Sequence, residues 1–279
     1  MSAEAMNGQA EKPTSSNPVS FLRPPVIETV LGVHFTPLSK FRNAHLGAFW
    51  KALGPEWPSV VDATPLSPQV ERFGGNQDWN SMGFQIKLSQ DLSTRLMIRH
   101  KNNDRMLQIQ NSRFHYNWLG ASGGVYPRYE TVRPEFDAHL LNFQRFLEDE
   151  KLGAIAPTQW EVTYVNQIPK GDLWSTPDQW ASIVKLLPSA APTNLLFEGV
   201  GGEWHYEIPP ARGRLHVQMR SAKDSDGKDQ LVLTFTARGP IIKGGTNLAE
   251  GLDLARSTIV SSFKGLTTER AHKYWGLEP

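Results

Sequence analysis

The residues whose types and spacing could do chemistry lie on alternate positions of the segment 212–220. Leu215, Val217 and Met219 occupy odd positions, and arginine, histidine or glutamine occupies the even ones. Because successive side chains of a β-strand point to opposite faces, this segment predicts a strand with one basic, polar face. The residues on that face are Arg212, Arg214, His216, Gln218 and Arg220.

Similar polar faces are expected on neighbouring strands in both halves of the chain. Their members are Arg95, Arg99, Lys101, Gln108, Gln110 and Arg238. Arginine can hold a phosphate or carboxylate through two parallel hydrogen bonds, so the faces predict a surface for nucleic acid, another polyanion or an acidic protein. The alternative is a solvated face that binds nothing, which is common on one side of an antiparallel sheet.

A second cluster combines aromatic rings with arginine between residues 113 and 130. Such groups stack on bases or line small-molecule pockets. The members are Arg113, His115, Tyr116, Trp118, Tyr126, Arg128 and Tyr129. A pocket requires these side chains to converge on one cavity. The alternative is ordinary aromatic packing at the end of a strand and in its loop.

Several common catalytic and cofactor motifs are absent. The chain has no cysteine, no Walker or dinucleotide glycine motif, no Gly-x-Ser-x-Gly, and no histidine pair at the i, i+4 spacing of a helical zinc motif. Glu161 alternates onto the polar side of a strand, but one carboxylate is not an acid/base pair. We therefore predict no catalytic residue, no cofactor and no metal site. A metal site built from histidines and carboxylates far apart in the sequence stays open.

The overall charge does not indicate an anionic partner. The 279 residues include 29 Lys and Arg against 28 Asp and Glu, a formal net charge of +1, so any electrostatic specialisation is local. No apolar run reaches the ~20 residues of a membrane span, and the first residues do not resemble a secretory signal. We expect a cytoplasmic protein that does not engage a membrane.

The elements that must position these residues follow one order twice. We predict a disordered tail over 1–20, a first α+β module over 21–153 and a second over 157–279. In the first module, strands are expected over 27–35, 84–88, 95–101 and 106–111, and helices over 44–53 and 134–147, with an irregular segment over 55–80. In the second, strands are expected over 160–168, 195–199, 203–208, 213–220 and 230–238, and helices over 177–187, 247–263 and 267–275.

This order predicts an α+β fold of two tandem modules about a pseudo-two-fold. Each module is an antiparallel sheet with helices on one face, similar to helix-grip and TATA-binding-protein-like modules. The sheet face without helices is where we expect function to lie.

Several segments together resemble a bacterial protein family of about this length that is sporadically distributed and has no assigned biochemistry. The segments are PPVIETVLGVHFTPL at 24–38, HLGAFW at 45–50, LQIQN at 107–111, NW at 117–118, YPRY at 126–129 and VTYVNQI at 162–168. The resemblance spans 24–276. It implies a patchily inherited accessory protein, as in phage defence, and it carries over no catalytic residues.

The first functional hypothesis is a non-enzymatic binding or sensor protein that uses the basic sheet faces for nucleic acid or an acidic protein. A second is a small-molecule-binding protein or enzyme with a pocket at the aromatic cluster 113–130. A third is a scaffold subunit of a larger complex, and a homodimer is also left open.

Overall fold

The computed structural model describes residues 19–74, 94–120, 125–187 and 194–278. It is an α+β fold with a nine-stranded antiparallel sheet of order β2-β3-β4-β5-β1-β6-β9-β8-β7. The strands are β1 Val26–Phe35, β2 Ser59–Ala63, β3 Arg95–Arg99, β4 Arg105–Gln110, β5 Arg113–Leu119, β6 Pro157–Pro169, β7 Gly202–Ile208, β8 Gly213–Lys223 and β9 Asp229–Pro240. The helices are α1 Asn43–Ala52, α2 Tyr129–Asp149, α3 Leu248–Leu266 and α4 Glu269–Trp275, with a 3-10 turn, η3, at Pro177–Ser182.

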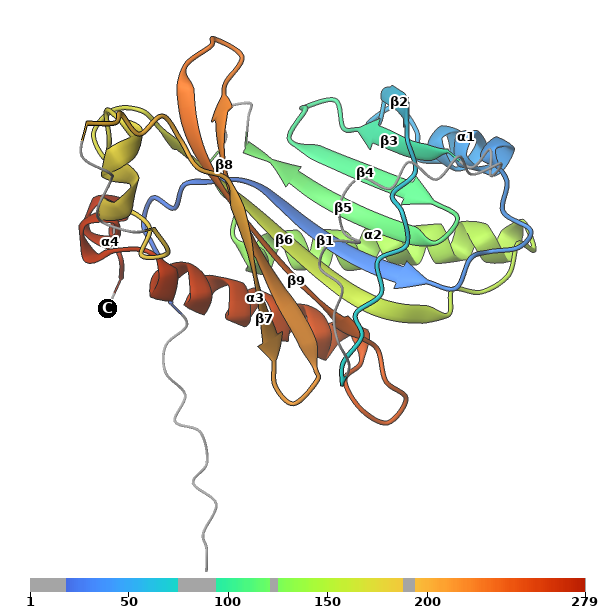
Figure 1. The fold of residues 1–279 in the computed structure, drawn as a ribbon. Coiled ribbons are helices and arrows are strands. Elements are labelled where there is room, and N and C mark those ends of the chain that lie inside the picture. Colours follow the sequence, from blue (N-terminus) through green and yellow to red (C-terminus); the bar gives the residue numbers. More distant parts are fainter. Residues whose placement is uncertain (1–18, 75–93, 121–124, 188–193, 279) are drawn as a thin grey trace, which may run out of the picture.

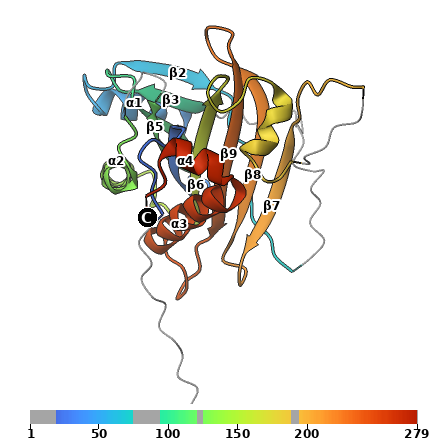
Figure 2. The ribbon, with the colours of Figure 1, turned by 90° about the vertical axis from the view of Figure 1, so that its left-hand side faces the viewer.

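The strands of the two expected modules belong to one continuous sheet. They are joined where β1 pairs antiparallel with β6, for example at Thr29 opposite Tyr164. Helix α2 contacts β5, and α3 contacts β6 and β9. Figures 1 and 2 show both long helices on the same side of the sheet, and within the described residues no helix lies on the other side.

The core forms between this sheet and the long helices. Apolar residues of α2 recur at helical spacing and are buried, as Phe136, Leu140 and Phe143 illustrate. In α3, Ile259 and Phe263 are buried in the same way. On the strands, alternate side chains enter this core, and the intervening ones face the opposite side of the sheet.

Several expected elements differ in the structure. The segment 55–80 was expected to be irregular, but it contains β2, which pairs with β3. The expected helix over 177–187 is wrong: only the 3-10 turn η3 forms, ending at Ser182, where buried Trp180 fixes it to the core. Residues 195–199 are not a strand. The strand expected over 84–88 and residues 1–18 of the tail lie outside the described residues.

A further strand and the start of one helix also differ from the prediction. Residues 113–119 form the complete strand β5, where no strand was expected; packing at a strand end and in its loop was the alternative considered for the aromatic cluster. Helix α2 begins at Tyr129, well before Pro134, which was expected in its first turn. Among the described residues, none of the helices is long and apolar enough to span a bilayer.

Trp160 of β6 is fully buried because three glycines make room for its indole ring. A Cβ built at Gly213, Gly239 or Gly251 would lie 2.7, 2.3 or 2.1 Å from a ring atom of Trp160. Since real Cβ contacts are not this short, any side chain at these positions must displace the ring or the backbone. Helix α3 can approach β6 closely only because residue 251 is glycine.

We predict that Gly251→Ala lowers the free energy of unfolding by roughly 1–3 kcal/mol, the usual cost of overpacking a core. Gly47→Ala in α1 is the control, because nothing lies within 4 Å of a Cβ there. That change should raise stability by up to ~1 kcal/mol through helix propensity. Denaturant unfolding of both variants measures the difference, and equal stability of the two would contradict the packing described around Trp160.

Candidate functional site

The sheet face without helices is crossed by the segment 64–74, here called the strap, which follows β2 (Figure 1). Two glutamine side chains hold its backbone. Gln110 accepts a hydrogen bond from the Leu66 N–H at 2.9 Å and donates to the Leu66 carbonyl at 3.1 Å. Gln159 accepts from the Glu71 N–H at 2.9 Å. These amides replace the sheet partners that an irregular segment lacks.

Glu71 of the strap contacts charged side chains of the sheet through its carboxylate. Its carboxylate accepts hydrogen bonds from Arg214, from Arg238 at 3.0 Å and from His216 at 2.7 Å. These partners come from β8 and β9. The Glu71 side chain is only 3% exposed, so the ions are removed from water together. Removing one member of such a buried ion cluster destabilises the folded protein, because a charge is then left buried without its partner.

A second carboxylate, Glu161 of β6, lies at the centre of the same face. Arg238 Nε donates to Glu161 Oε2 at 2.6 Å, so Arg238 links the two glutamates. His34 Nε2 lies 3.3 Å from Glu161 Oε2, and His115 Nε2 lies 3.7 Å from Oε1. Glutamate and histidine from three adjacent strands therefore meet under the strap.

Burial and charge set the protonation of these groups. Burial alone would raise the pKa of Glu71, but the hydrogen bond from His216 and the nearby arginines outweigh it and lower the pKa. In the same way, burial opposes the charge of Glu161, yet Arg238 holds the pKa of Glu161 well below its usual range. Burial lowers the pKa of His115 to about 3, so its imidazole is neutral at pH 7.

The expected basic residues do not form one open surface. Arg214, His216, Arg238 and Gln110 lie under or against the strap, and Arg95 donates to Gln108 at 2.6 Å. At the margins, exposed Lys101 pairs with Glu56, and exposed Gln218 donates to Glu203. The remaining members, Arg99, Arg212 and Arg220, are exposed.

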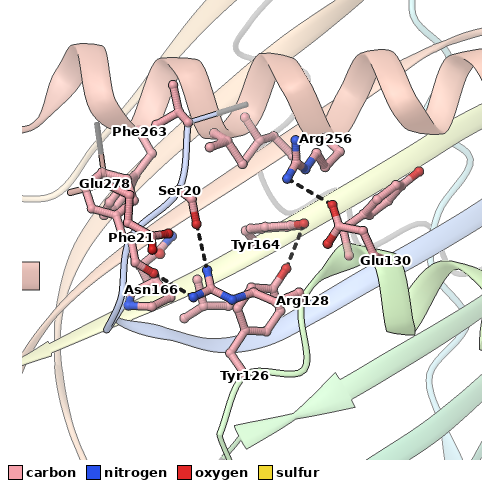
Figure 3. Close-up of a pocket in the computed structure, with 16 residues that line it drawn as sticks. Ser20, Phe21, Tyr126, Arg128, Glu130, Tyr164, Asn166, Arg256, Phe263 and Glu278 are labelled. Atoms are coloured by element: carbon pink, nitrogen blue, oxygen red, sulfur yellow. Dashed lines mark hydrogen bonds and ion pairs between the residues drawn. The ribbon is translucent and has the colours of Figure 1, made fainter. Parts of the chain in front are cut away.

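A cavity of about 310 Å³ lies on the opposite, helix-covered side of the sheet (Figure 3). Its walls are the middle of α3, the start of α2, strand β6 and the segment 19–26. One part of the lining is apolar, with Phe21, Ile259, Val260 and Phe263. The polar part consists of Ser20, Tyr126, Arg128, Tyr129, Glu130, Tyr164, Asn166, Arg256 and Glu278.

The polar part contains hydroxyl and guanidinium groups that can bind a ligand. The hydroxyls of Tyr126 and Tyr164 are 2.9 Å apart and share one hydrogen bond, which leaves one O–H for another acceptor. Arg256 donates to the exposed carboxylate of Glu130 at 3.3 Å, and its guanidinium lies over the ring of Tyr129, 5.9 Å from the ring centroid. Figure 3 shows Tyr164, Arg256 and Glu130 on one side of the lining, and Phe21, Phe263 and Glu278 on the other.

Arg128 has an unusual backbone for its place in the cavity wall. Its φ of +71° is one that residues other than glycine seldom adopt, at a cost of about 1–3 kcal/mol. Its guanidinium donates to the Phe21 carbonyl at 2.8 Å, which holds the segment 19–26 against the cavity. Strain of this kind persists where the surrounding contacts fix the residue, and such positions cluster at ligand sites.

The expected aromatic pocket is divided by the sheet. Tyr126, Arg128 and Tyr129 line the cavity. Tyr116 and Trp118 are packed in the core, and Arg113 and His115 point to the strap side. A single strand sends alternate residues to opposite faces, so the seven residues cannot converge.

Other residues of both sites were not singled out from the sequence. Glu71 lies in a proline-rich segment without periodicity, so no pattern could place it over the sheet. His34 and Tyr164 follow the alternation of β1 and β6. This alternation predicts the side of the sheet on which each residue lies, but not which residues lie next to it. Arg256 lies on an α3 surface that a helical pattern predicts to be solvated.

No family model and no curated protein matches the sequence. Among solved structures, the crystal structure of DynU16, a protein in the dynemicin biosynthetic locus, is similar over 86% of this chain and 97% of that chain. The two are 12% identical, with a TM-score of 0.25. Similarity this low carries no conclusion about function.

We predict that Glu71→Gln lowers the free energy of unfolding at pH 7 by about 3–5 kcal/mol, because Arg214 and Arg238 lose their buried counter-charge. The pKa of Glu71 is lowered in the folded protein, so its contribution is complete above the usual glutamate range and disappears as pH falls through the lowered pKa. The difference between wild type and variant, followed by denaturant unfolding against pH, should therefore shrink in acid.

The exposed pair partner Glu56 provides the control. Glu56→Gln should leave stability near that of the wild type at every pH, because exposed ion pairs contribute little. A Glu71→Gln protein as stable as Glu56→Gln at pH 7 would contradict the role given to the strap carboxylate.

Proposed function

We propose that the protein binds a small molecule in the cavity between α3, the start of α2 and β6. The observation that carries this proposal is the cavity's division into an apolar part and a polar part with two arginines, two glutamates and tyrosine hydroxyls. Binding sites of this size combine apolar walls with a few polar groups that fix the orientation of the ligand. The strained backbone of Arg128 in the wall supports the same proposal.

The lining favours an amphipathic ligand with an anionic head. Arg256 is the group to receive that head, because its partner Glu130 is exposed and holds it weakly. The spare hydroxyl hydrogen of the Tyr126 and Tyr164 pair can donate to the same head. The body of the ligand would lie on Ile259 and Phe263.

An anionic macromolecule on the sheet face is the second candidate. It is supported by Arg99 and Arg220, which are exposed on strands of that face. The centre of that face is already neutralised by Glu71, so this partner would contact the margins. A scaffold role, a homodimer, a cytoplasmic location and a part in phage defence are proposals that rest on the sequence and its family resemblance alone.

We also propose that the two halves of the chain are modules related by a pseudo-two-fold axis. The order β5-β1 next to β6-β9 supports it, since the opening strands of the two halves are neighbours. Each half also supplies one long helix to the same face, α2 and α3. The cavity would then lie near the axis, between elements of both halves.

We predict that a carboxylate with an apolar chain or ring, such as decanoate or 1-naphthylacetate, binds the full chain and raises its melting temperature. Arg256→Gln should weaken binding by about tenfold to a hundredfold, since a hydrogen bond to a charged group contributes roughly 1.5–3 kcal/mol. Val260→Trp should abolish binding by filling the cavity. Calorimetric titration measures both.

The methyl esters of the same ligands test the charge, and Arg212→Gln is the control variant, because Arg212 is exposed and does not line the cavity. Esters should bind more weakly than the acids, and Arg212→Gln should bind like the wild type. Affinity for these acids that survives Val260→Trp would place the ligand elsewhere and overturn the proposal.

A further inference from the structure

Three side chains with metal-ligand atoms converge under the strap, on the adjacent strands β5, β1 and β6. His115, His34 and Glu161 each contribute one nitrogen or oxygen, and these atoms lie within 4.8 Å of one another. The histidines are each 4% exposed and Glu161 is 7% exposed. Two imidazoles and one carboxylate are a donor set suited to first-row transition metals, with positions left for other ligands.

The sheet register brings these groups together. Gly32 of β1 lies opposite His115 on one side and opposite Glu161 on the other. A Cβ at Gly32 would lie 2.6 Å from Cδ2 and 2.9 Å from Nε2 of His115. The glycine therefore allows the imidazole to lean across β1 toward the carboxylate. His34, two residues along β1, projects from the same face.

The two histidines have buried nitrogen atoms that lack good partners. Among the described residues, neither His34 Nε2 nor His115 Nε2 makes a hydrogen bond. Their contacts with Glu161, at 3.3 and 3.7 Å, are misaligned or too long. Buried polar atoms nearly always have a partner. We propose that the partner is one divalent transition-metal ion, such as Zn²⁺, held by His34, His115 and Glu161.

The surrounding residues orient the ligands. Arg238 holds Glu161 Oε2 at 2.6 Å, which leaves Oε1 directed toward His115. Hydrogen-bonded partners of this kind fix metal-binding carboxylates. Binding requires the His34 proton on Nδ1, so the 3.3 Å contact of that atom with the Gln159 amide nitrogen is given up. Gln159 keeps its bonds to the strap backbone.

Nearby positive charge limits the affinity. Arg113 and Arg238 act electrostatically on His34, and the same charges repel a cation. We therefore expect micromolar rather than nanomolar binding. The ion would connect three neighbouring strands, of which β5 and β1 come from the first half of the chain and β6 from the second. It would stabilise the centre of the sheet.

The test is titration of the chelator-treated full chain with Zn²⁺ by calorimetry. We expect one equivalent bound and a higher melting temperature, and Co²⁺ should give a visible spectrum with nitrogen and oxygen ligands. His115→Ala should lose all three effects. His205→Ala should keep them, because His205 pairs with His216 outside the cluster. No binding by the wild type, or equal binding by His115→Ala, would overturn the proposal.

Two further variants separate loss of the site from loss of folding. Gly32→Ala keeps every ligand but displaces the His115 ring, so it should weaken Zn²⁺ binding at least tenfold. Arg113→Gln removes a repelling charge and should tighten binding severalfold, which no loss of folding would produce. Unchanged affinity in both variants would show that the ion lies elsewhere, and the proposal would fail.

Discussion

The ion cluster around Glu71 is the interaction on which the helix-free sheet face depends. Arg214 and Arg238 project from neighbouring strands, where two buried guanidinium groups would repel each other. One carboxylate from the strap lies between them and neutralises both in part. Without it, the strands β8 and β9 could not keep these arginines away from water. The strap therefore belongs to the sheet energetically, although it forms no strand.

This cluster also changes the meaning of the basic alternation in β8 and β9. The pattern resembles a surface prepared for an external anion, yet the anion at its centre is part of the chain. Gln110 and Gln159 strengthen this arrangement, because they bind the backbone of the strap as a partner strand would. Specific contact with another molecule is consequently better supported at the cavity, where the ion-pair partner of Arg256 is an exposed carboxylate.

The sequence predicted on which side of the sheet a residue lies better than it predicted which residues come together in a site. Period-two alternation correctly assigned Arg214 and Arg238 to the side opposite the core, because the pleat alone determines it. Helical spacing likewise identified the buried stripe of α2. The strap had no comparable signal, since its position depends on side chains distant in sequence, such as Gln159. For the same reason, the seven aromatic-cluster residues were grouped by proximity along the chain, and the alternation of β5 then separated them.

Strand β6 contributes side chains to the sites on both faces of the sheet. Its even-numbered residues Tyr164 and Asn166 line the cavity, and odd-numbered Glu161 lies beneath the strap. Strand β1 is shared in the same way, because Val26 lines the cavity and His34 lies beside Glu161. A ligand in the cavity and an ion at Glu161 would therefore act on the same pair of strands from opposite faces. Any shift of β1 along β6 would alter both sites together, and the resulting coupling of affinities would be reciprocal by thermodynamic necessity.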